Sequence, residues 1–436
     1  METALYERYN NQPVPTEIYL TIAMNTEAIQ YDARQAMQIA ASIARPRRVG
    51  SQAETQVGRD LANRLKQAGY QVQAEPFRFT DVHSVFLLLE IIVCQVLVAV
   101  TMWLHAAGSP IQIMTAVLLF LLLGLVNGIN RAVQAGSLVV EGFRPTTWAR
   151  MCQRLGRSYQ STNYVARISD SPVEMSLPHL ILVAHYDSKS QRIPLAVRIT
   201  LFVVSIGGAL LFAGLILLSP LMPELTTPAL ILGGLMLAAS VSLWFLDLGD
   251  DSPGAIDNAS SVGVVVELAQ ALAKNQEIYR KIDLTILLTS AEEVSTMGAI
   301  AYVHRHEKDL LNWAKSNRMY VLNLEGVGVD GSLRWVGKGE QASLASEPCL
   351  LRLVRQACIE QGCEIRNFNL PGALYDHLPF AALGLDAGTL MAVNRASLGV
   401  HTRRDSADQL DLRGFERAGQ ITLKVIQALL SPGNIF

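Results

Sequence analysis

The sequence predicts an α/β protein with three layers, α, β and α, built on a mixed, largely parallel central sheet and interrupted by two transmembrane helical hairpins. Short segments rich in β-branched residues alternate with helical segments, as in α/β layer folds. Four apolar stretches approach the length of about 20 residues that crosses a bilayer. Several predicted strands also end on an acidic residue or a histidine, and ligands of α/β proteins gather at the carboxyl ends of strands.

The elements of the sheet domain can be followed along the chain. We expect residues 1–35 to form an N-terminal extension and residues 36–436 to form one domain that the hairpins interrupt. Its second helix is amphipathic, because apolar residues recur at helical spacing from Val57 to Leu65, and a strand follows from about Tyr70. Further strands are predicted in the segments NYVARI, LPHLILVAHYD, IDLTILLTSAEE and RMYVLNLEGVG.

The apolar stretches pair into two hairpins, at residues 84–129 and 197–246. The four predicted spans are 84–104, 111–129, 199–218 and 229–246. The turn within each hairpin contains no Lys or Arg, whereas basic residues flank the outer ends of the spans. These flanking residues are Arg78, Arg131, Arg144, Lys189, Arg192 and Arg198. The positive-inside bias therefore predicts a multi-pass integral membrane protein of four helices, in contact with the lipid bilayer, with its catalytic domain on the cytoplasmic side.

Composition excludes one class of partner. The chain has 36 Lys and Arg residues against 38 Asp and Glu residues, so it lacks the basic excess of nucleic-acid-binding proteins. Its five cysteines form no C-x-x-C pair, which favours reduced thiols and a non-secretory catalytic face. Nothing in the sequence predicts the oligomeric state.

Candidate site residues lie at the ends of three predicted strands. His185 and Asp187 end one strand, Glu292 and Glu293 follow the next, and Glu325 ends a third. Because such ends meet at one edge of a parallel sheet, we expect these side chains to converge.

Two further candidates lie in loops. Asp257 is in the turn-rich segment DDSPGAIDNASSVG, and His401 is in LGVHTRRDS. If residues 193–247 are set aside, His185 and Asp257 become near neighbours in the sequence, so the second hairpin interrupts an active-site loop.

Two histidines and several carboxylates in one crevice suit a pair of divalent ions, most simply two Zn²⁺. Asp257 is the natural bridge between ions about 3.5 to 4 Å apart. Asp187 shares a strand face with His185, so it can accept the second imidazole N–H and fix the tautomer. Glu292 and Glu293 point apart, so one can bind metal while the other takes a proton from the metal-activated water.

Six motifs carry a resemblance to a known family. In chain order they are HYDS, PGAIDNASSVG, TSAEEVSTMGA, NLEGVG, YDHLPF and HTRRDS. With these motifs the chain resembles the co-catalytic zinc exopeptidases, a family that includes secreted bacterial aminopeptidases, aminopeptidase Y and glutamate carboxypeptidase. The resemblance extends from about residue 36 to 430 and excludes the four spans.

The resemblance implies a role for each candidate. It implies that His185 and Glu325 bind one zinc ion, that Glu293 and His401 bind the other, that Asp257 is shared, that Glu292 is the general base and that Asp187 orients His185. His377 in YDHLPF matches a motif residue that binds no metal. The family usually has Asp at the position of Glu325, and the extra methylene moves the ligand oxygens, so another divalent metal is the alternative to zinc.

The resulting hypothesis is a membrane-anchored zinc metallopeptidase, an exopeptidase and most simply an aminopeptidase, whose substrates are peptides. One alternative is carboxypeptidase chemistry, with Arg403 and Arg404 holding a carboxylate, and another is glutaminyl cyclase chemistry on the same scaffold. The third is a non-catalytic, peptidase-like membrane scaffold.

Overall fold

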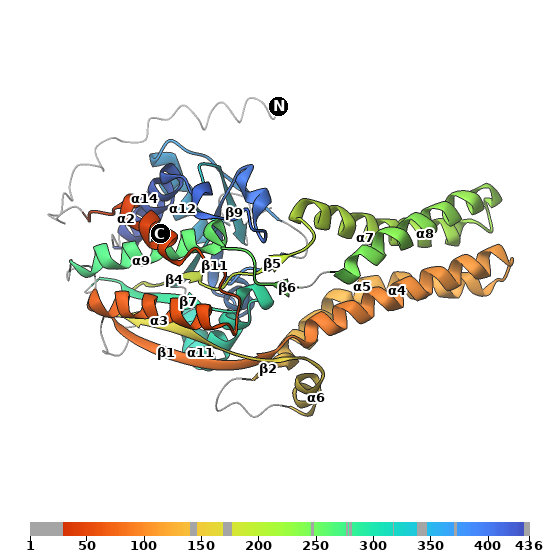
Figure 1. The fold of residues 1–436 in the computed structure, drawn as a ribbon, viewed down its shortest axis with the longest axis horizontal. Helices are drawn as coiled ribbons and strands as arrows, with labels where there is room; N and C mark the ends of the chain where they lie inside the picture. Colours follow the sequence, from red (N-terminus) through yellow and green to blue (C-terminus); the bar gives the residue numbers. More distant parts are fainter. Residues whose placement is uncertain are drawn as a thin grey trace. The chain divides into compact units, whose positions relative to one another are not determined.

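A nine-stranded sheet forms the centre of the described part of the protein in this computed structural model (Figure 1). The structure describes residues 29–430 except 140–145, 169–176, 246–247, 276–277, 279–280, 317, 338–346 and 370–372. The strands are β1 Gln71–Thr80, β2 Leu138–Val139, β3 Ser158–Arg167, β4 His179–His185, β7 Asp283–Thr289, β8 Met319–Glu325, β9 Ser332–Gly337, β10 Ile365–Asn367 and β11 Asp386–Val393, in the spatial order β10-β9-β11-β8-β4-β7-β3-β1-β2.

The sheet is mixed, as predicted. The central strands β11, β8, β4 and β7 pair in parallel, and so do β10 and β9. The remaining pairings, between β9 and β11 and from β7 through β3 and β1 to β2, are antiparallel. Every residue of β4 and of β8 is buried, which explains why both read as continuous apolar runs rather than alternating ones.

Helices cover both faces of the sheet, which confirms the α/β arrangement (Figure 1). They are α2 Ala33–Ile43, α3 Gln52–Gln67, α6 Thr147–Leu155, α9 Ser260–Ala273, α11 Met297–Ser316, α12 Cys349–Glu360, α13 Leu378–Ala382 and α14 Leu412–Leu429. Helix α9 contacts β4, β7 and β8, and α2, α3 and α14 pack against α9. On the other face, Ile181 and Val183 of β4 share a hydrophobic core with Tyr302 of α11 and Phe380 of α13.

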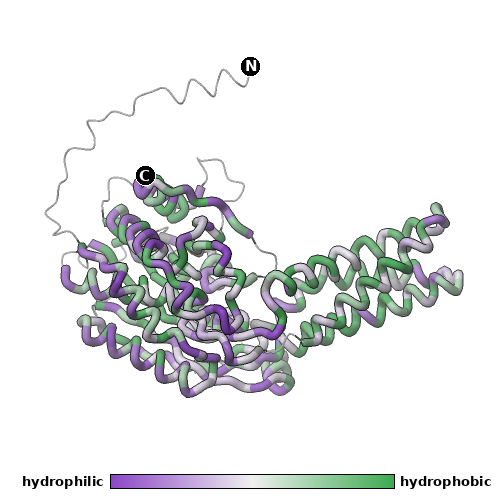
Figure 2. The backbone as a smooth tube through the Cα atoms, turned by 45° about the horizontal axis from the view of Figure 1, so that its top comes forward, coloured by the Kyte–Doolittle hydropathy of each residue, from purple (hydrophilic) through white to green (hydrophobic). Residues whose placement is uncertain are grey.

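Four long apolar helices pack together beside the sheet domain: α4 Val82–Ala106, α5 Ile111–Ser137, α7 Leu195–Leu218 and α8 Thr226–Val241. Short 3-10 turns, η2 Pro223–Leu225 and η3 Ser242–Phe245, extend α8 at its two ends. The hydropathy colouring of Figure 2 shows the hydrophobic character of these helices along most of their length.

Three of the four predicted spans meet the length and hydropathy expected of a membrane-crossing helix: Val82–Ala106, Ala196–Leu218 and Pro223–Phe245. At the fourth position the described apolar stretch is Ile111–Val126, and the helix continues to Ser137. The prediction of four spans is therefore supported at three positions.

Each hairpin leaves and re-enters the sheet domain through a two-residue β-ladder. At the first hairpin, Phe79 of β1 pairs with Leu138 of β2. At the second, β5 Ser190–Gln191 pairs with β6 Leu248–Gly249. Because β5 begins five residues after His185, the second hairpin starts beside the end of β4, which explains why a candidate ligand and an apolar span lie so close in the sequence.

Candidate metal centre

The ends of three neighbouring strands place most of the predicted site residues at one edge of the sheet. His185 is the last residue of β4, which lies between β7 and β8 in the sheet. Glu325 is the last residue of β8, and Glu292 and Glu293 lie in the turn η5 Glu292–Val294 just after β7. The predicted convergence of these strand ends is therefore observed.

The backbone is strained at two of the loops that complete the site. Ala291 and Ser295, on either side of η5, have φ values of 59° and 67°. His401 has a φ of 64°. Non-glycine residues in this left-handed region cost about 1 to 3 kcal/mol each and persist where the surroundings fix them, as at ligand sites.

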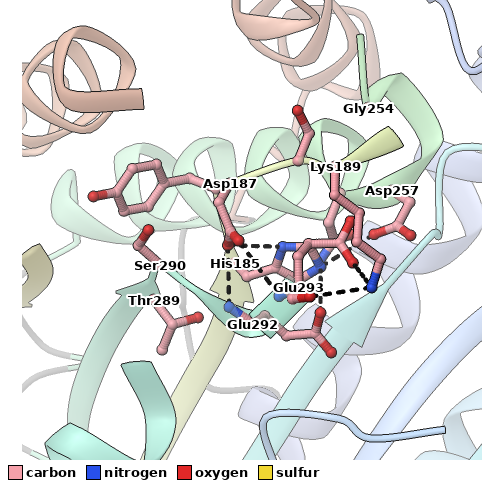
Figure 3. A network of polar contacts seen from close by, with 12 residues as sticks. His185, Asp187, Lys189, Gly254, Asp257, Thr289, Ser290, Glu292 and Glu293 are labelled. Carbon is pink, nitrogen blue, oxygen red and sulfur yellow. Dashed lines mark hydrogen bonds and ion pairs between the residues drawn. The ribbon is translucent and has the colours of Figure 1, made fainter. Parts of the chain in front are cut away.

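Asp257 lies between the two imidazoles. Its Oδ1 atom is 3.1 Å from Nε2 of His185, and its Oδ2 atom is 3.0 Å from Nε2 of His401. Oε1 of Glu325 lies 3.3 Å from the same nitrogen of His185, and Oε2 of Glu293 lies 3.2 Å from that of His401. All five predicted metal ligands therefore meet, as Figure 3 shows for three of them.

Two sets of three side chains have donor atoms within 4.8 Å of one another. We call His185, Glu292 and Glu325 the first metal group, and Asp257, Glu293 and His401 the second metal group. Oδ1 of Asp257 and Oε1 of Glu293 are buried and form no hydrogen bond among the described residues. Of these two oxygens, Oδ1 of Asp257 faces Nε2 of His185. Unpaired buried carboxylate oxygens call for a cation, and this nitrogen and oxygen donor set fits zinc.

The electrostatics differ between neighbouring residues. Burial and the nearby carboxylate of Glu325 raise the pKa of Glu292 well above its ordinary value. Burial and Asp257 also raise the pKa of Glu293, but His401 and Lys189 outweigh them and bring this pKa below its ordinary value. The two adjacent glutamates therefore occupy opposite environments.

Burial and neighbouring charges also shift the pKa values of His185, Asp257 and Glu325. Burial alone would lower the pKa of His185, but Glu325 and Glu292 raise it well above its ordinary value. Burial opposes ionisation of Asp257, yet the facing imidazoles of His185 and His401 hold its pKa well below the usual range. Burial raises the pKa of Glu325 to about 8, with Asp257 adding to this rise and His185 opposing it.

Asp187 contacts both His185 and the turn that carries the two glutamates. Its Oδ1 atom lies 3.4 Å from Nδ1 of His185. The same carboxylate accepts the backbone N–H groups of Glu292 at 3.2 Å and of Glu293 at 3.4 Å. Asp187 therefore joins the end of β4 to η5, a connection that the sequence did not predict.

Three further residues hold the loops of the site in place and were missed by sequence reasoning. The fully buried guanidinium of Arg47 donates to the carbonyl oxygens of Tyr186 and Gly254, at 2.6 and 2.8 Å. Asp405 accepts the N–H of Asp257 at 3.3 Å. Nδ2 of Asn258 donates to Oε2 of Glu325 at 3.3 Å. Asp405 and Asn258 lie inside motifs that the sequence displays, whereas Arg47 lies in a segment, RPRR, that reads as a surface turn.

Two basic residues that flank the second hairpin reach the second metal group. Nζ of Lys189 lies 2.8 Å from Oε2 of Glu293, as Figure 3 shows. Nη2 of Arg198 lies 3.3 Å from Nδ1 of His401. In the sequence both are only charges that flank a span, whereas the structure places both beside predicted ligands.

Two other residues of interest lie outside the two metal groups. His377 is buried, and its Nδ1 atom lies 2.7 Å from the hydroxyl of Thr389. Arg403 pairs with Asp251 at 2.8 Å, and its side chain is 81% exposed.

Comparisons with known proteins agree with this geometry. The chain is 24% identical over 184 residues to a Caenorhabditis elegans protein with the assigned name endoplasmic reticulum metallopeptidase 1-A, and 24% identical over 197 residues to aminopeptidase YwaD of Bacillus subtilis. These alignments cover 42% and 41% of this chain but 20% and 38% of the relatives, so the chain spans well under half the length of either.

The fold is shared with a solved aminopeptidase from Aneurinibacillus sp. strain AM-1. The TM-score is 0.54 at 14% identity, over 93% of this chain and 96% of that one. The model of peptidase family M28 matches residues 163–426, which is more than half of the sequence. The chain therefore belongs to peptidase family M28, which confirms its resemblance to the co-catalytic zinc exopeptidases.

Proposed function

We propose that the protein is a membrane-anchored di-zinc exopeptidase, and specifically an aminopeptidase. The observation that supports it best is the carboxylate of Asp257, whose two oxygens lie 3.1 and 3.0 Å from the two imidazoles. A carboxylate in this position can bridge two ions, with His185 and Glu325 on one side and Glu293 and His401 on the other.

Bound zinc would polarise the scissile carbonyl and acidify a water molecule. Glu292 is the candidate base, because it is buried, lies 3.7 Å from Nε2 of His185, and is not needed to complete either pair of ligands. Its carboxylate takes the proton from the attacking water and passes that proton to the leaving amine. Asp187 positions the base, since it holds the backbone N–H of Glu292, and orients His185 through Nδ1.

The proposal favours aminopeptidase over carboxypeptidase chemistry. A carboxypeptidase needs a cation that holds the free carboxylate beside the metals, and Arg403 and Arg404 were the candidates for this role. The Arg403 guanidinium instead pairs with Asp251 on the surface. Arg403 and Arg404 line a cavity to which none of the seven predicted site residues contributes. The cations beside the second metal group, Lys189 and Arg198, already contact Glu293 and His401.

Membrane anchoring has its support in the three apolar segments that are long enough to cross a bilayer. The positive-inside argument for a cytoplasmic catalytic domain rests on fewer basic residues than the sequence suggests, because Lys189 and Arg198 contact site residues. Arg78, Arg131 and Arg192 still flank the helices outside the hairpin turns. Protease protection in sealed vesicles of known orientation tests this side, and cleavage of the catalytic domain only from the outer side would contradict it.

The deciding experiment replaces Glu292 with Gln, which keeps the shape of the side chain and removes the base. We expect kcat for an aminoacyl anilide to fall by at least about 100-fold, as for the loss of a general base, with zinc content unchanged. Glu307→Gln, at an exposed position of α11, is the matched control. Full activity of Glu292→Gln would refute the role of this residue.

The same purified protein separates the alternative reactions. An aminopeptidase cleaves peptides with a free amino terminus and spares N-acetylated ones. Preferential cleavage of N-acetylated peptides with a free carboxyl terminus would indicate a carboxypeptidase, and loss of ammonia from an N-terminal glutamine would indicate a cyclase. Less than one metal ion per chain together with no turnover would indicate a non-catalytic scaffold.

A further inference from the structure

We propose that a cavity between the ends of the apolar helices and the sheet domain binds an anionic phospholipid of the surrounding bilayer. This inference rests on the membrane anchoring proposed above. The cavity has a volume of about 1540 Å³, above the range of about 300 to 1,000 Å³ that is usual for small-molecule sites. It is formed by the start of α4, the turn η3, the β5–β6 ladder and the loop of residues 395–404.

The charged part of the lining is strongly cationic. Six arginines and two aspartates contribute to it, with no lysine and no glutamate. One aspartate, Asp251, is already paired with Arg403. Arg395 and Arg404 are exposed, and neither takes part in an ion pair with another described residue. Guanidinium groups in this arrangement fit a phosphate diester, which they can grip through paired N–H groups.

Several other residues of the lining are apolar and yet open to solvent. Val85 and Leu88 of α4 are 38% and 40% exposed, Trp244 of η3 is 49% exposed, and Leu398 is 59% exposed. Val85, Leu88 and Trp244 lie in segments long enough to cross a bilayer, within about three turns of the ends of those segments. Such ends lie at the depth of the lipid headgroups, where tryptophan is enriched.

The two parts of the lining together select an amphiphile. Apolar walls that continue into the proposed spans would take acyl chains, and the arginines of the sheet domain would take the phosphate. Basic pockets beside membrane helices are a known means of binding anionic headgroups. A small soluble anion would leave the apolar walls in water, and a neutral lipid would leave Arg395 and Arg404 without an anion.

The cavity also borders the catalytic domain. The loop of residues 395–404 contributes Arg395 and Arg404 to the lining and carries His401 of the second metal group. In addition, the N–H of Gln191, another lining residue, donates to the carbonyl oxygen of His401 at 2.9 Å. A lipid held in the cavity would therefore contact the segment that positions one of the predicted ligands.

The test uses the full chain in nanodiscs made of equal parts phosphatidylcholine and phosphatidylglycerol, with retained lipid counted by native mass spectrometry. We expect phosphatidylglycerol to be retained at least about fivefold over phosphatidylcholine, in line with the attraction of basic residues to anionic lipid. The double variant Arg395→Gln/Arg404→Gln should bring this ratio close to one. Leu398→Asn should lower retention of both lipids.

Arg352→Gln/Arg366→Gln is the matched control, since both residues are exposed and neither lines the cavity. It should keep the wild-type ratio. An equal ratio for wild type, or an equal loss in the control, overturns the lipid site. Displacement of the lipid by glycerol phosphate overturns it in favour of an anion site, and displacement by an apolar peptide with a free carboxylate overturns it in favour of a peptide site.

The same experiment distinguishes failure of the lipid site from failure of the proposed membrane anchoring. A chain that stays in solution without detergent and does not enter nanodiscs refutes membrane anchoring and the lipid site with it. A chain that enters nanodiscs but retains both lipids equally refutes the lipid site alone, and leaves the anchored exopeptidase to be judged by the Glu292→Gln experiment.

Discussion

The two metal groups contain similar ligands but are surrounded by different charges. Beside the first group, no Lys or Arg in the described part of the chain forms an ion pair with Glu292 or Glu325. Beside the second, Lys189 lies 2.8 Å from Glu293 and Arg198 lies 3.3 Å from His401. A unit charge about 4 Å from another contributes about 4 kcal/mol at the effective dielectric of a protein surface. The second group should therefore hold a divalent ion less tightly than the first.

Asp257→Asn removes the proposed bridge between the two ions, and it should have the largest effect. The amide keeps the shape of the side chain but removes the charge that lies between the two imidazoles. Because both ions lose a ligand, we expect kcat/KM to fall at least about 1,000-fold, beyond the 10- to 100-fold typical of residues that only support a ligand.

Metal content by plasma mass spectrometry should fall below one ion per chain in Asp257→Asn. The control Asp309→Asn changes an exposed position of α11 and should keep both ions. If Asp257→Asn retained two ions, the bridging role of this residue would be wrong.

Chelator titration tests the difference between the groups directly. Zinc should leave the wild-type protein in two steps, with the second group emptied first. Lys189→Met removes the cation next to Glu293 and keeps most of the apolar volume. The zinc affinity of the second metal group should therefore rise by about 10-fold or more, because 1.4 kcal/mol corresponds to 10-fold and Lys189 is partly solvated.

The exposed residue Lys308 supplies the control, Lys308→Met, which should leave both steps unchanged. A single release step with two ions in the wild type would contradict unequal groups. An unchanged weaker step in Lys189→Met would mean that the lysine moves away when the ion binds.

The convergence of several candidate ligands could be predicted from the sequence because these residues lie at the ends of strands. His185 and Glu325 end strands whose apolar runs are legible, and neighbouring parallel strands bring such ends together. The charges around the ligands were not predictable in this way. Lys189 lies two residues beyond Asp187 and reads as a flank of an apolar hairpin. Its contact with Glu293 depends on the folded position of η5, which is distant in the sequence.

The role of Arg47 in the fold was also not predictable from the sequence. Its buried guanidinium satisfies carbonyl groups of loops that are about 140 and 200 residues away in the sequence. Nothing local in RPRR distinguishes such an arginine from a solvated one, because the acceptors belong to turns whose position depends on the completed sheet.

Glu325→Asp should have the smallest effect, and it concerns the first metal group. Glu325→Asp restores the residue type usual in the family but shortens the reach of the carboxylate by one methylene. The backbone at this position is fixed by pairing of Glu325 with Met391 of β11, so the oxygens must retreat from His185 and from Nδ2 of Asn258. We expect the affinity of the first metal group for zinc to fall by no more than about 10-fold, which is the scale of one weakened supporting contact.

Glu325→Gln keeps the length and removes the charge, so it should weaken the same step further than Glu325→Asp does. The step assigned to the second group should be unchanged in both variants, because Glu293 and His401 do not contact Glu325 among the described interactions. Tighter zinc binding in Glu325→Asp would mean that the ion lies deeper in the sheet edge than the present position of the Glu325 oxygens. The first ion would then be held mainly by His185 and by the bridging Asp257, and the extra methylene of Glu325 would contribute little to zinc binding.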